Sequence, residues 1–186
     1  EEHNEQWLLQ HGFQLKYPPG DQYVEGAGDA LFCGDTLFAG YRMRSDAAGL
    51  QDIGRIFGCR VIPLELVDTR YYHLDTCFCP LKPGQTIYYP AAFDSYGRKV
   101  LTELVDDLIE VESEEACHFS CNAVVVGETV VTNEGCPKMH RQLKRRGYRV
   151  IETQLSEFVK AGGSAKCLTL RLDGEDAASW TAETEE

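Results

Sequence analysis

The chain lacks any long apolar run and is poor in basic residues. No segment approaches the roughly 18 consecutive apolar residues that a membrane-spanning helix requires, so the sequence predicts no membrane partner. Eighteen Lys and Arg residues stand against thirty Asp and Glu, which gives a formal net charge of −12. Nucleic-acid binding needs a basic footprint, and this balance argues against it. An acidic field instead favours a small cationic ligand.

The sequence also shows no secretory signal, and it begins Glu1-Glu2-His3-Asn4 rather than with an initiator methionine. We therefore expect a processed, trimmed or partial chain in the cytoplasm. Eight cysteines are present, several of them in apolar segments where a free thiol packs as a small hydrophobic side chain. Because 186 residues suffice for an ordinary core, a reducing compartment and mostly free thiols fit best.

A strand, tight turn, strand, helix, strand pattern occurs three times, at a spacing of roughly 45 residues. A glycine marks each tight turn, and the helices carry apolar residues at helical spacing. The predicted hairpins span residues 30–41, 75–89 and 123–132, the helices 45–57, 93–105 and 137–146, and the closing strands 60–66, 108–111 and 148–153.

No such unit buries both faces of its sheet alone, so we expect the three units to pack around a shared centre. Hairpin ends from distant parts of the chain would then converge. The alternative is an ordinary α+β sandwich in which the similarity of the units is accidental. Residues 173–186 are acidic and without periodicity, which predicts a disordered tail.

A cysteine, Cys167, follows the turn Gly162-Gly163, and the alternation over residues 167–172 predicts a strand that starts at this thiol. The glycines let the backbone bend and leave room for a ligand. Far upstream, Tyr72-His73-Leu74-Asp75 and Glu25-Gly26-Ala27-Gly28-Asp29 supply an imidazole and carboxylates. A thiol, an imidazole and carboxylates are the parts of a covalent Cys/His hydrolytic site.

Six segments in order resemble the guanidino-group-modifying superfamily, which has the pentein fold of five ββαβ blades. They read VEGAGDALF, GYRMRSD, YHLDTCFCPL, CNAVVVGETVV, GYRVIETQLSEF and AGGSAKCLTLRL. The superfamily includes dimethylarginine dimethylaminohydrolases, arginine deiminases, arginine dihydrolases and amidinotransferases. The resemblance implies an α+β propeller, with a catalytic region at residues 24–172 that holds about three blades.

The resemblance implies that Cys167 is the nucleophile, which attacks the guanidino carbon and forms a covalent amidino-thioether. A free thiol with a pKa of about 8.5 needs activation, from a bound guanidinium or from charged His73. His73 would be the general acid and base, a role that suits a group titrating near working pH.

By the same resemblance, Glu25 pairs with the histidine and the guanidinium, and Arg44 grips the substrate carboxylate, with Arg42 as the second choice. Asp29 and Asp75 are expected to bind substrate, since carboxylates form bidentate bonds with a guanidinium. On a strand, Asp75 would share a face with His73. Asn122 is expected to be structural, by bonding backbone near the site.

Family members carry more chain before the Glu25 motif, so residues 1–23 are expected to be the end of an incomplete N-terminal blade. A second chain or a further segment would then complete the propeller, and open strand edges favour a homo-oligomer. The resemblance implies a small cationic guanidino substrate, no cofactor and no metal. A zinc site built from Cys77, Cys79, Cys117, His118 and Cys121 is the metal alternative, although these spacings are unusual for zinc.

Three outcomes of the same intermediate stay open: hydrolysis of dimethylarginine, hydrolysis of arginine to citrulline or ornithine, and amidino transfer to an amine. A non-catalytic binding module of the pentein fold is the alternative from another class of protein. Such modules lack the cysteine, histidine and acid set that this chain carries.

Overall fold

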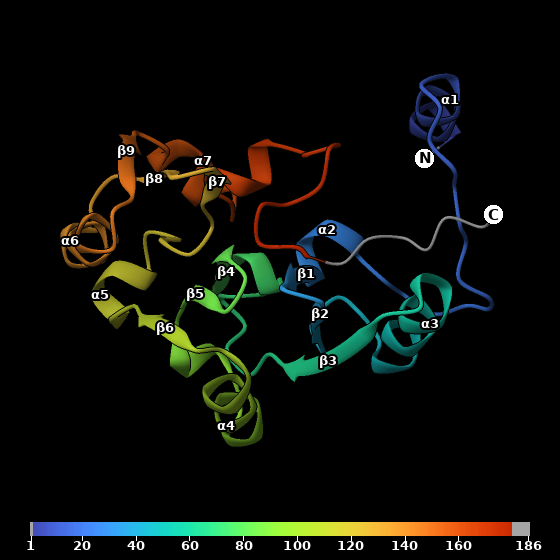
Figure 1. The fold of residues 1–186 in the computed structure, drawn as a ribbon, viewed down its shortest axis with the longest axis horizontal. Coiled ribbons are helices and arrows are strands. Elements are labelled where there is room, and N and C mark those ends of the chain that lie inside the picture. Colours follow the sequence, from blue (N-terminus) through green and yellow to red (C-terminus); the bar gives the residue numbers. More distant parts are fainter. Residues whose placement is uncertain (1, 180–186) are drawn as a thin grey trace.

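The computed structural model describes residues 2–179, and three three-stranded sheets follow one another along the chain. In Figure 1 the three units lie in an arc, with a helix of each unit, α3, α4 or α6, on its outer side. The strands are β1 (Ala30–Cys33), β2 (Thr36–Tyr41) and β3 (Arg60–Glu65), then β4 (Phe78–Lys82), β5 (Gln85–Tyr88) and β6 (Asp107–Glu110), then β7 (Val124–Val126), β8 (Thr129–Asn133) and β9 (Arg149–Thr153).

Each sheet is an antiparallel hairpin whose second strand pairs in parallel with the closing strand of its unit. The hairpin turns hold glycine at Gly34, Gly84 and Gly127, with φ of 66°, 75° and 56°. Positive φ favours glycine, which explains why the sequence marks these turns so clearly. Three separate sheets exclude the two-sheet sandwich, and the propeller of about three ββαβ units is the observed architecture.

The helices follow from local capping as well as from apolar spacing. They are α1 (Glu2–Gln10), α2 (Gly26–Asp29), α3 (Ala47–Phe57), α4 (Ser95–Leu104), α5 (Ser113–Ala116), α6 (Pro137–Arg145) and α7 (Ser156–Lys160), with the 3₁₀ helices η1 (Leu74–Thr76), η2 (Pro90–Ala92) and η3 (Lys166–Leu168). Asp94 caps α4 by accepting from the backbone N–H of Gly97 at 2.7 Å. The buried carboxylate of Glu115 does the same for α6, at Lys138 and Met139.

One hydrophobic core runs through all three units, from Leu31 and Phe38 through Phe78 and Ile87 to Val130. The rings of Phe38 and Phe78 lie 5.3 Å apart and join the first unit to the second. Burial of such aromatic side chains is the main favourable term available to the fold. The helix α1, by contrast, contributes no buried residue and stands away from the three units in Figure 1.

Two predicted strands are wrong where the site lies. The strand predicted from Asp75 begins only at Phe78, because η1 occupies residues 74–76. The segment after Cys167 forms no strand, because within residues 2–179 no neighbouring strand pairs with it. Its alternating side chains Leu168, Leu170 and Leu172 are exposed.

The first part of the acidic tail is packed, where the sequence predicts disorder. The backbone N–H of Gly34 donates to Ala177 at 2.7 Å, and Ala177 is buried. Asp176 accepts from the backbone N–H of Gly127 at 2.7 Å. The segment thereby crosses from the third unit to the first, and these tertiary bonds carry no signal in its composition. The rest of the predicted tail, residues 180–186, lies outside the described residues.

Among the described helices, none has the length and apolar character to cross a bilayer.

Candidate active site

The nucleophile candidate lies on a loop that follows helix α7. The chain turns at Gly162, whose φ is 92°, and Cys167 sits exposed in η3. A Cβ on Gly163 would lie 2.9 Å from Cβ of Cys167 and 3.2 Å from its Sγ. Real Cβ atoms do not approach so closely, so glycine at 163 makes room for the thiol. The Gly-Gly signal in the sequence therefore has a steric cause.

His73 stands directly before η1 and faces the motif around α2. Its Nε2 lies 2.6 Å from Oε2 of Glu25. A Cβ on Gly28 would come within 2.7 Å of the Nδ1 atom of His73. The backbone of Gly28 thus packs against one edge of the imidazole, and the carboxylate of Glu25 binds the other edge. These two contacts fix the orientation of the ring.

Glu25 binds both the imidazole and a guanidinium. Its Oε1 accepts from Nε of Arg44 at 3.0 Å and pairs with Nη2 of the same residue at 2.9 Å. Burial raises the pKa of Glu25, but the hydrogen bonds from His73 and Arg44 outweigh this effect and hold the pKa below its usual value. Glu25 therefore stays a carboxylate at neutral pH, ready to support a charged imidazole.

Arg44 is brought to the site, and Arg42 is not. Arg42 adopts a φ of 92° at the end of β2 and pairs with Glu65 at 2.6 Å. The sharp turn at Arg42 lets the following residues point back, so that Arg44 reaches Glu25 and the guanidinium of Arg44 lies 5.6 Å from the centre of the Tyr72 ring. Of the two arginines considered, Arg44 has the geometry for a ligand at the site.

Asp29, which the sequence predicts to bind substrate, contacts the protein itself through both carboxylate oxygens, and substrate binding by it stays a prediction. Its side chain is wholly buried, and both carboxylate oxygens accept hydrogen bonds. Oδ2 accepts from the Ser45 hydroxyl at 2.7 Å, and Oδ1 accepts from the backbone N–H of Leu74 at 2.9 Å. Burial raises the pKa of Asp29 despite these bonds. Asp29 ties the Arg44 turn to η1, and so it positions the residues that flank it.

Asp75 does reach the thiol, although it lies on a 3₁₀ turn rather than on the predicted strand. Its Oδ2 is 3.8 Å from Sγ of Cys167, while its Oδ1 is buried and has no hydrogen-bond partner among the described residues. Burial raises the pKa of Asp75 to about 6. A desolvated carboxylate beside a nucleophile, with one oxygen unpartnered, is a strong site for a cation.

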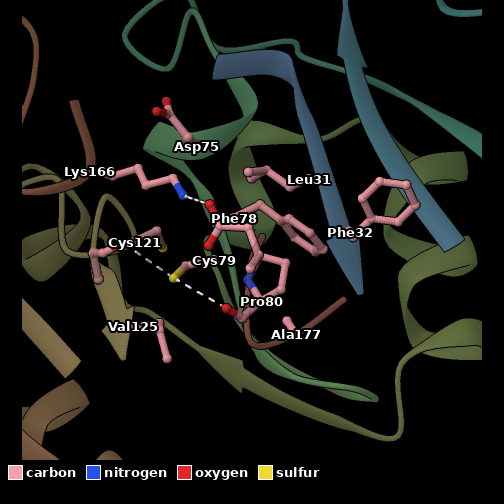
Figure 2. A pocket seen from close by; sticks show the side chains of 12 residues that line it. Leu31, Phe32, Asp75, Phe78, Cys79, Pro80, Cys121, Val125, Lys166 and Ala177 are labelled. Carbon is pink, nitrogen blue, oxygen red and sulfur yellow. Dashed lines mark hydrogen bonds and ion pairs between the residues drawn. The ribbon is translucent and has the colours of Figure 1, made fainter. Parts of the chain in front are cut away.

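A small pocket of about 20 Å³ lies beside this carboxylate, lined by residues of all three units and of the C-terminal segment. Asp75 and Lys166 line one end of it, and Phe78, Cys79 and Pro80 line the apolar part (Figure 2). Lys166 reaches in from the Cys167 loop and forms an ion pair with Glu175 of the C-terminal segment. No local pattern predicts this pair, because composition alone marks Glu175 as part of a solvated tail.

The thiol of Cys167 is not activated by the protein alone. Although the residue as a whole is exposed, neighbouring groups partly desolvate its thiol and raise the pKa, and the negative charge of Asp75 raises it further. Cys167 and His73 share no hydrogen bond within the described residues, so the imidazole does not hold the thiolate directly. A cation placed between Asp75 and Glu25 would reverse the electrostatic balance at the sulfur.

Asn122 is buried, and its side chain binds the loop that carries Cys167. Its amide N–H donates to the backbone oxygen of Asp75 at 3.1 Å. Its Oδ1 accepts from the backbone N–H groups of Ser164 at 2.9 Å and of Cys167 at 3.2 Å. One amide thus joins the two chain segments that carry the acid and the thiol, which agrees with the structural role expected from the sequence.

The remaining cysteines do not assemble a metal site among residues 2–179, where no group of three or more His, Cys, Asp or Glu side chains has the arrangement to hold an ion. All eight cysteines are free thiols. Cys77 and Cys79 are buried and hydrogen-bond to backbone carbonyl groups, at Leu74 and Ala123 respectively. Core packing accounts for both.

Comparison with known proteins decides the family. A family model described as N,N dimethylarginine dimethylhydrolase, eukaryotic, matches residues 4–173. The chain belongs to this family. It thereby belongs to the guanidino-modifying superfamily that the six segments resemble.

Relatives of this dimethylarginine hydrolase family include two kinds of enzyme. The bifunctional arginine dihydrolase/ornithine cyclodeaminase ArgZ of Synechocystis sp. is 44% identical over 170 residues, which are 89% of this chain and 24% of the relative. The N(G),N(G)-dimethylarginine dimethylaminohydrolase of Mycobacterium tuberculosis is 38% identical over 167 residues, 89% of this chain and 54% of the relative. The chain thus spans about a quarter to a half of these proteins.

The fold agrees with a crystal structure of the N-terminal domain of ArgZ in which an asparagine-to-serine variant is covalently bonded to a reaction intermediate. The TM-score is 0.88 and the identity 43%, over 92% of this chain and 64% of that chain. The three units described above are therefore part of a family fold that extends further in this relative.

Proposed function

We propose that this chain carries the nucleophile side of a hydrolase that acts on the guanidino carbon of an arginine-type amino acid. The observation that supports this most directly is the buried carboxylate of Asp75, whose Oδ2 contacts the thiol of Cys167 and whose Oδ1 has no partner among the described residues. His73, two residues earlier in the chain, pairs with Glu25. A planar cation that lies against Asp75 and Glu25 would present its carbon to the sulfur.

The guanidinium itself would activate the nucleophile. Its positive charge offsets the burial and the Asp75 charge that raise the pKa of Cys167, so the thiolate forms where substrate is bound. Sulfur then bonds to the guanidino carbon, and His73 gives its proton to the departing amine. In the second half, neutral His73 takes a proton from water, the water oxygen bonds to the carbon, and the carbon–sulfur bond breaks to restore the thiolate.

Arg44 is proposed to bind the α-carboxylate of the substrate. Its guanidinium offers a planar fork of donors that fits a carboxylate, and about half of its side chain is exposed. In the free chain it pairs with Glu25, and a substrate carboxylate would compete for it. The charge pattern of the site, with acids around Cys167 and a cation at Arg44, is the complement of an amino acid with a guanidinium at its far end.

Arginine is the first candidate substrate, because the 44% identical relative is an arginine dihydrolase. Two successive hydrolyses at the guanidino carbon would convert arginine and two waters into ornithine, two ammonia molecules and carbon dioxide. Dimethylarginine is the second, with citrulline and dimethylamine as products, because the matching family model and the 38% identical relative carry that activity in their names. We also propose that polypeptide beyond these three units, in this protein or in a partner subunit, completes the substrate pocket.

The test is intact-mass analysis of the full-length protein after treatment with 2-chloroacetamidine, a guanidinium mimic that alkylates cysteine. We expect one adduct, which Cys167→Ser removes and Cys117→Ser, a change at another exposed cysteine, retains. Arginine and dimethylarginine should protect in the order of their binding, and mass analysis of the products separates ornithine from citrulline. Labelling of several cysteines at equal rates, or turnover that survives Cys167→Ser, would contradict the proposal.

A further inference from the structure

Tyr72 contacts three parts of the candidate site at once. Its hydroxyl donates to the backbone oxygen of Gly162 at 2.8 Å. The guanidinium of Arg44 lies 5.6 Å from the centre of its ring. The ring is also 4.7 Å from the imidazole of His73, at an angle of 51°. One side chain therefore touches the nucleophile loop, the carboxylate-binding candidate and the acid–base candidate.

The loop that Tyr72 holds has its freest backbone at this point. Gly162 adopts a φ of 92° and Gly163 follows it, so the chain has two successive residues without a side chain to restrict them. Asn122 anchors the far end of the loop, at Ser164 and Cys167. The hydroxyl of Tyr72 anchors the near end, across a sequence separation of 90 residues.

The packing around this bond is close. A Cβ on Gly162 would lie 3.3 Å from Cε1 of Tyr72 and 3.4 Å from its hydroxyl oxygen, so the glycine backbone rests against the ring. Burial raises the pKa of Tyr72, and the neighbouring Cys167 raises it further, so the phenol stays protonated. A hydroxyl has one proton, and Gly162 already accepts it, which leaves none for a reacting group.

We propose that Tyr72 is a positioning residue that latches the Gly162–Gly163 turn, and hence Cys167, onto the segment that carries His73, and that its ring couples this latch to Arg44. The proposal rests on the proposed function in one respect, namely that Cys167 is the nucleophile. The hydroxyl sets the approach of the thiol, whereas the ring orients Arg44, so the two parts of the side chain act on different kinetic constants.

Two variants separate these parts. Tyr72→Phe removes the hydroxyl and keeps the ring over Arg44. We expect it to lower kcat for arginine, and the rate of Cys167 alkylation by 2-chloroacetamidine, by about fivefold to twentyfold through a lost hydrogen bond and a misplaced thiol. KM should stay within about twofold of wild type. Tyr72→Leu removes the ring as well and should also raise KM, since Arg44 loses its support.

Tyr148→Phe is the matched control. The hydroxyl of Tyr148 donates to Oε1 of Gln85 at 2.6 Å, in a buried place away from the site. Its loss should lower stability without changing kcat or the alkylation rate. Amide hydrogen exchange of residues 161–168 gives a readout that needs no turnover, and it should quicken in Tyr72→Phe but not in Tyr148→Phe.

Unchanged loop exchange together with wild-type alkylation in Tyr72→Phe would overturn the latch. A fall in kcat matched by Tyr148→Phe would reduce Tyr72 to a stability role and overturn it as well. If the wild-type protein neither turns over arginine-type substrates nor reacts with 2-chloroacetamidine, the proposed function fails, while loop exchange and alkylation by neutral iodoacetamide still decide whether Tyr72 holds the loop.

Discussion

Nε2 of His73 lies 2.6 Å from Oε2 of Glu25, and Oε1 of the same carboxylate binds Arg44. One carboxylate therefore serves an imidazole with one oxygen and a guanidinium with the other. The two sides of the candidate site, acid–base and carboxylate-binding, are joined through Glu25. This link carries the first prediction.

Glu25→Gln should lower kcat by about 100-fold, because the amide keeps the shape but removes the charge that supports a protonated His73. The pKa of Glu25 is lowered in the folded chain, so the stabilising contribution of its carboxylate is fully present above the usual carboxyl pKa and is lost as pH falls through the lowered pKa. The pH dependence of kcat and of unfolding measures these effects. The control is Glu65→Gln, which alters the contacts of Glu65 with Arg42 and with the Tyr41 hydroxyl but none with His73. Equal activity of Glu25→Gln and wild type would refute the role.

Asp75→Asn should abolish turnover and yet stabilise the fold at neutral pH. The folded-state pKa of Asp75, about 6, exceeds its ordinary 3.8, so the stability it contributes is present below pH 4 and lost as pH rises through 6. The amide carries no such penalty, and the gain at pH 7.5 is at most on the order of 3 kcal/mol. Urea unfolding at pH 3.5 and pH 7.5 measures the difference.

Asp68→Asn is the control of opposite sign, because the Arg70 guanidinium holds the pKa of Asp68 below its usual value. Its stabilising effect is present at neutral pH and lost as pH falls, so this variant should be less stable than wild type at pH 7.5. If Asp75→Asn is also less stable than wild type at pH 7.5, the burial penalty assigned to Asp75 is wrong.

Gly28→Ala should lower kcat more than tenfold, because the added Cβ would meet Nδ1 of His73 at 2.7 Å and push the ring from Glu25. Gly26 of the same turn is the control, since a Cβ there meets nothing within 4 Å. We expect Gly26→Ala to stay near wild type. Steady-state kinetics of the two variants side by side checks the prediction, and equal kinetics would show that the imidazole has room to move.

Asn122→Ala should destabilise the protein by about 2–3 kcal/mol, because three backbone groups lose a buried hydrogen-bond partner. It should also lower kcat at a temperature where the variant is still folded. Asn133→Ala is the matched control: its buried amide bonds His118 and Leu155 in the third unit, away from the thiol. We expect both variants to lose a comparable amount of stability. Only Asn122→Ala should lower kcat, and Asn133→Ala should leave kcat unchanged. Unfolding curves and steady-state kinetics measure both.

Local signals explain how much of the fold could be predicted. The first hairpin begins and ends at the predicted residues 30 and 41, and each of the other predicted hairpins and closing strands begins within one residue of its prediction, except the hairpin that starts with β4. Alternation and turn glycines act over a few residues, so the chain shows them directly. The strand predicted at Asp75 was wrong because Asp29 and Asn122, from other units, hold the backbone of residues 74–75 in a turn.

The sequence by itself determined the three repeated units and which residue types are available for chemistry, since both depend on local pattern and on side-chain identity. Only the tertiary structure decided what each residue faces. It turned Asp29 inward, placed Asp75 against Cys167 with one carboxylate oxygen unpartnered, and placed Tyr72 on Gly162. These contacts join residues that are 45, 92 and 90 positions apart, and packing of the shared core, rather than any local preference, brings them together.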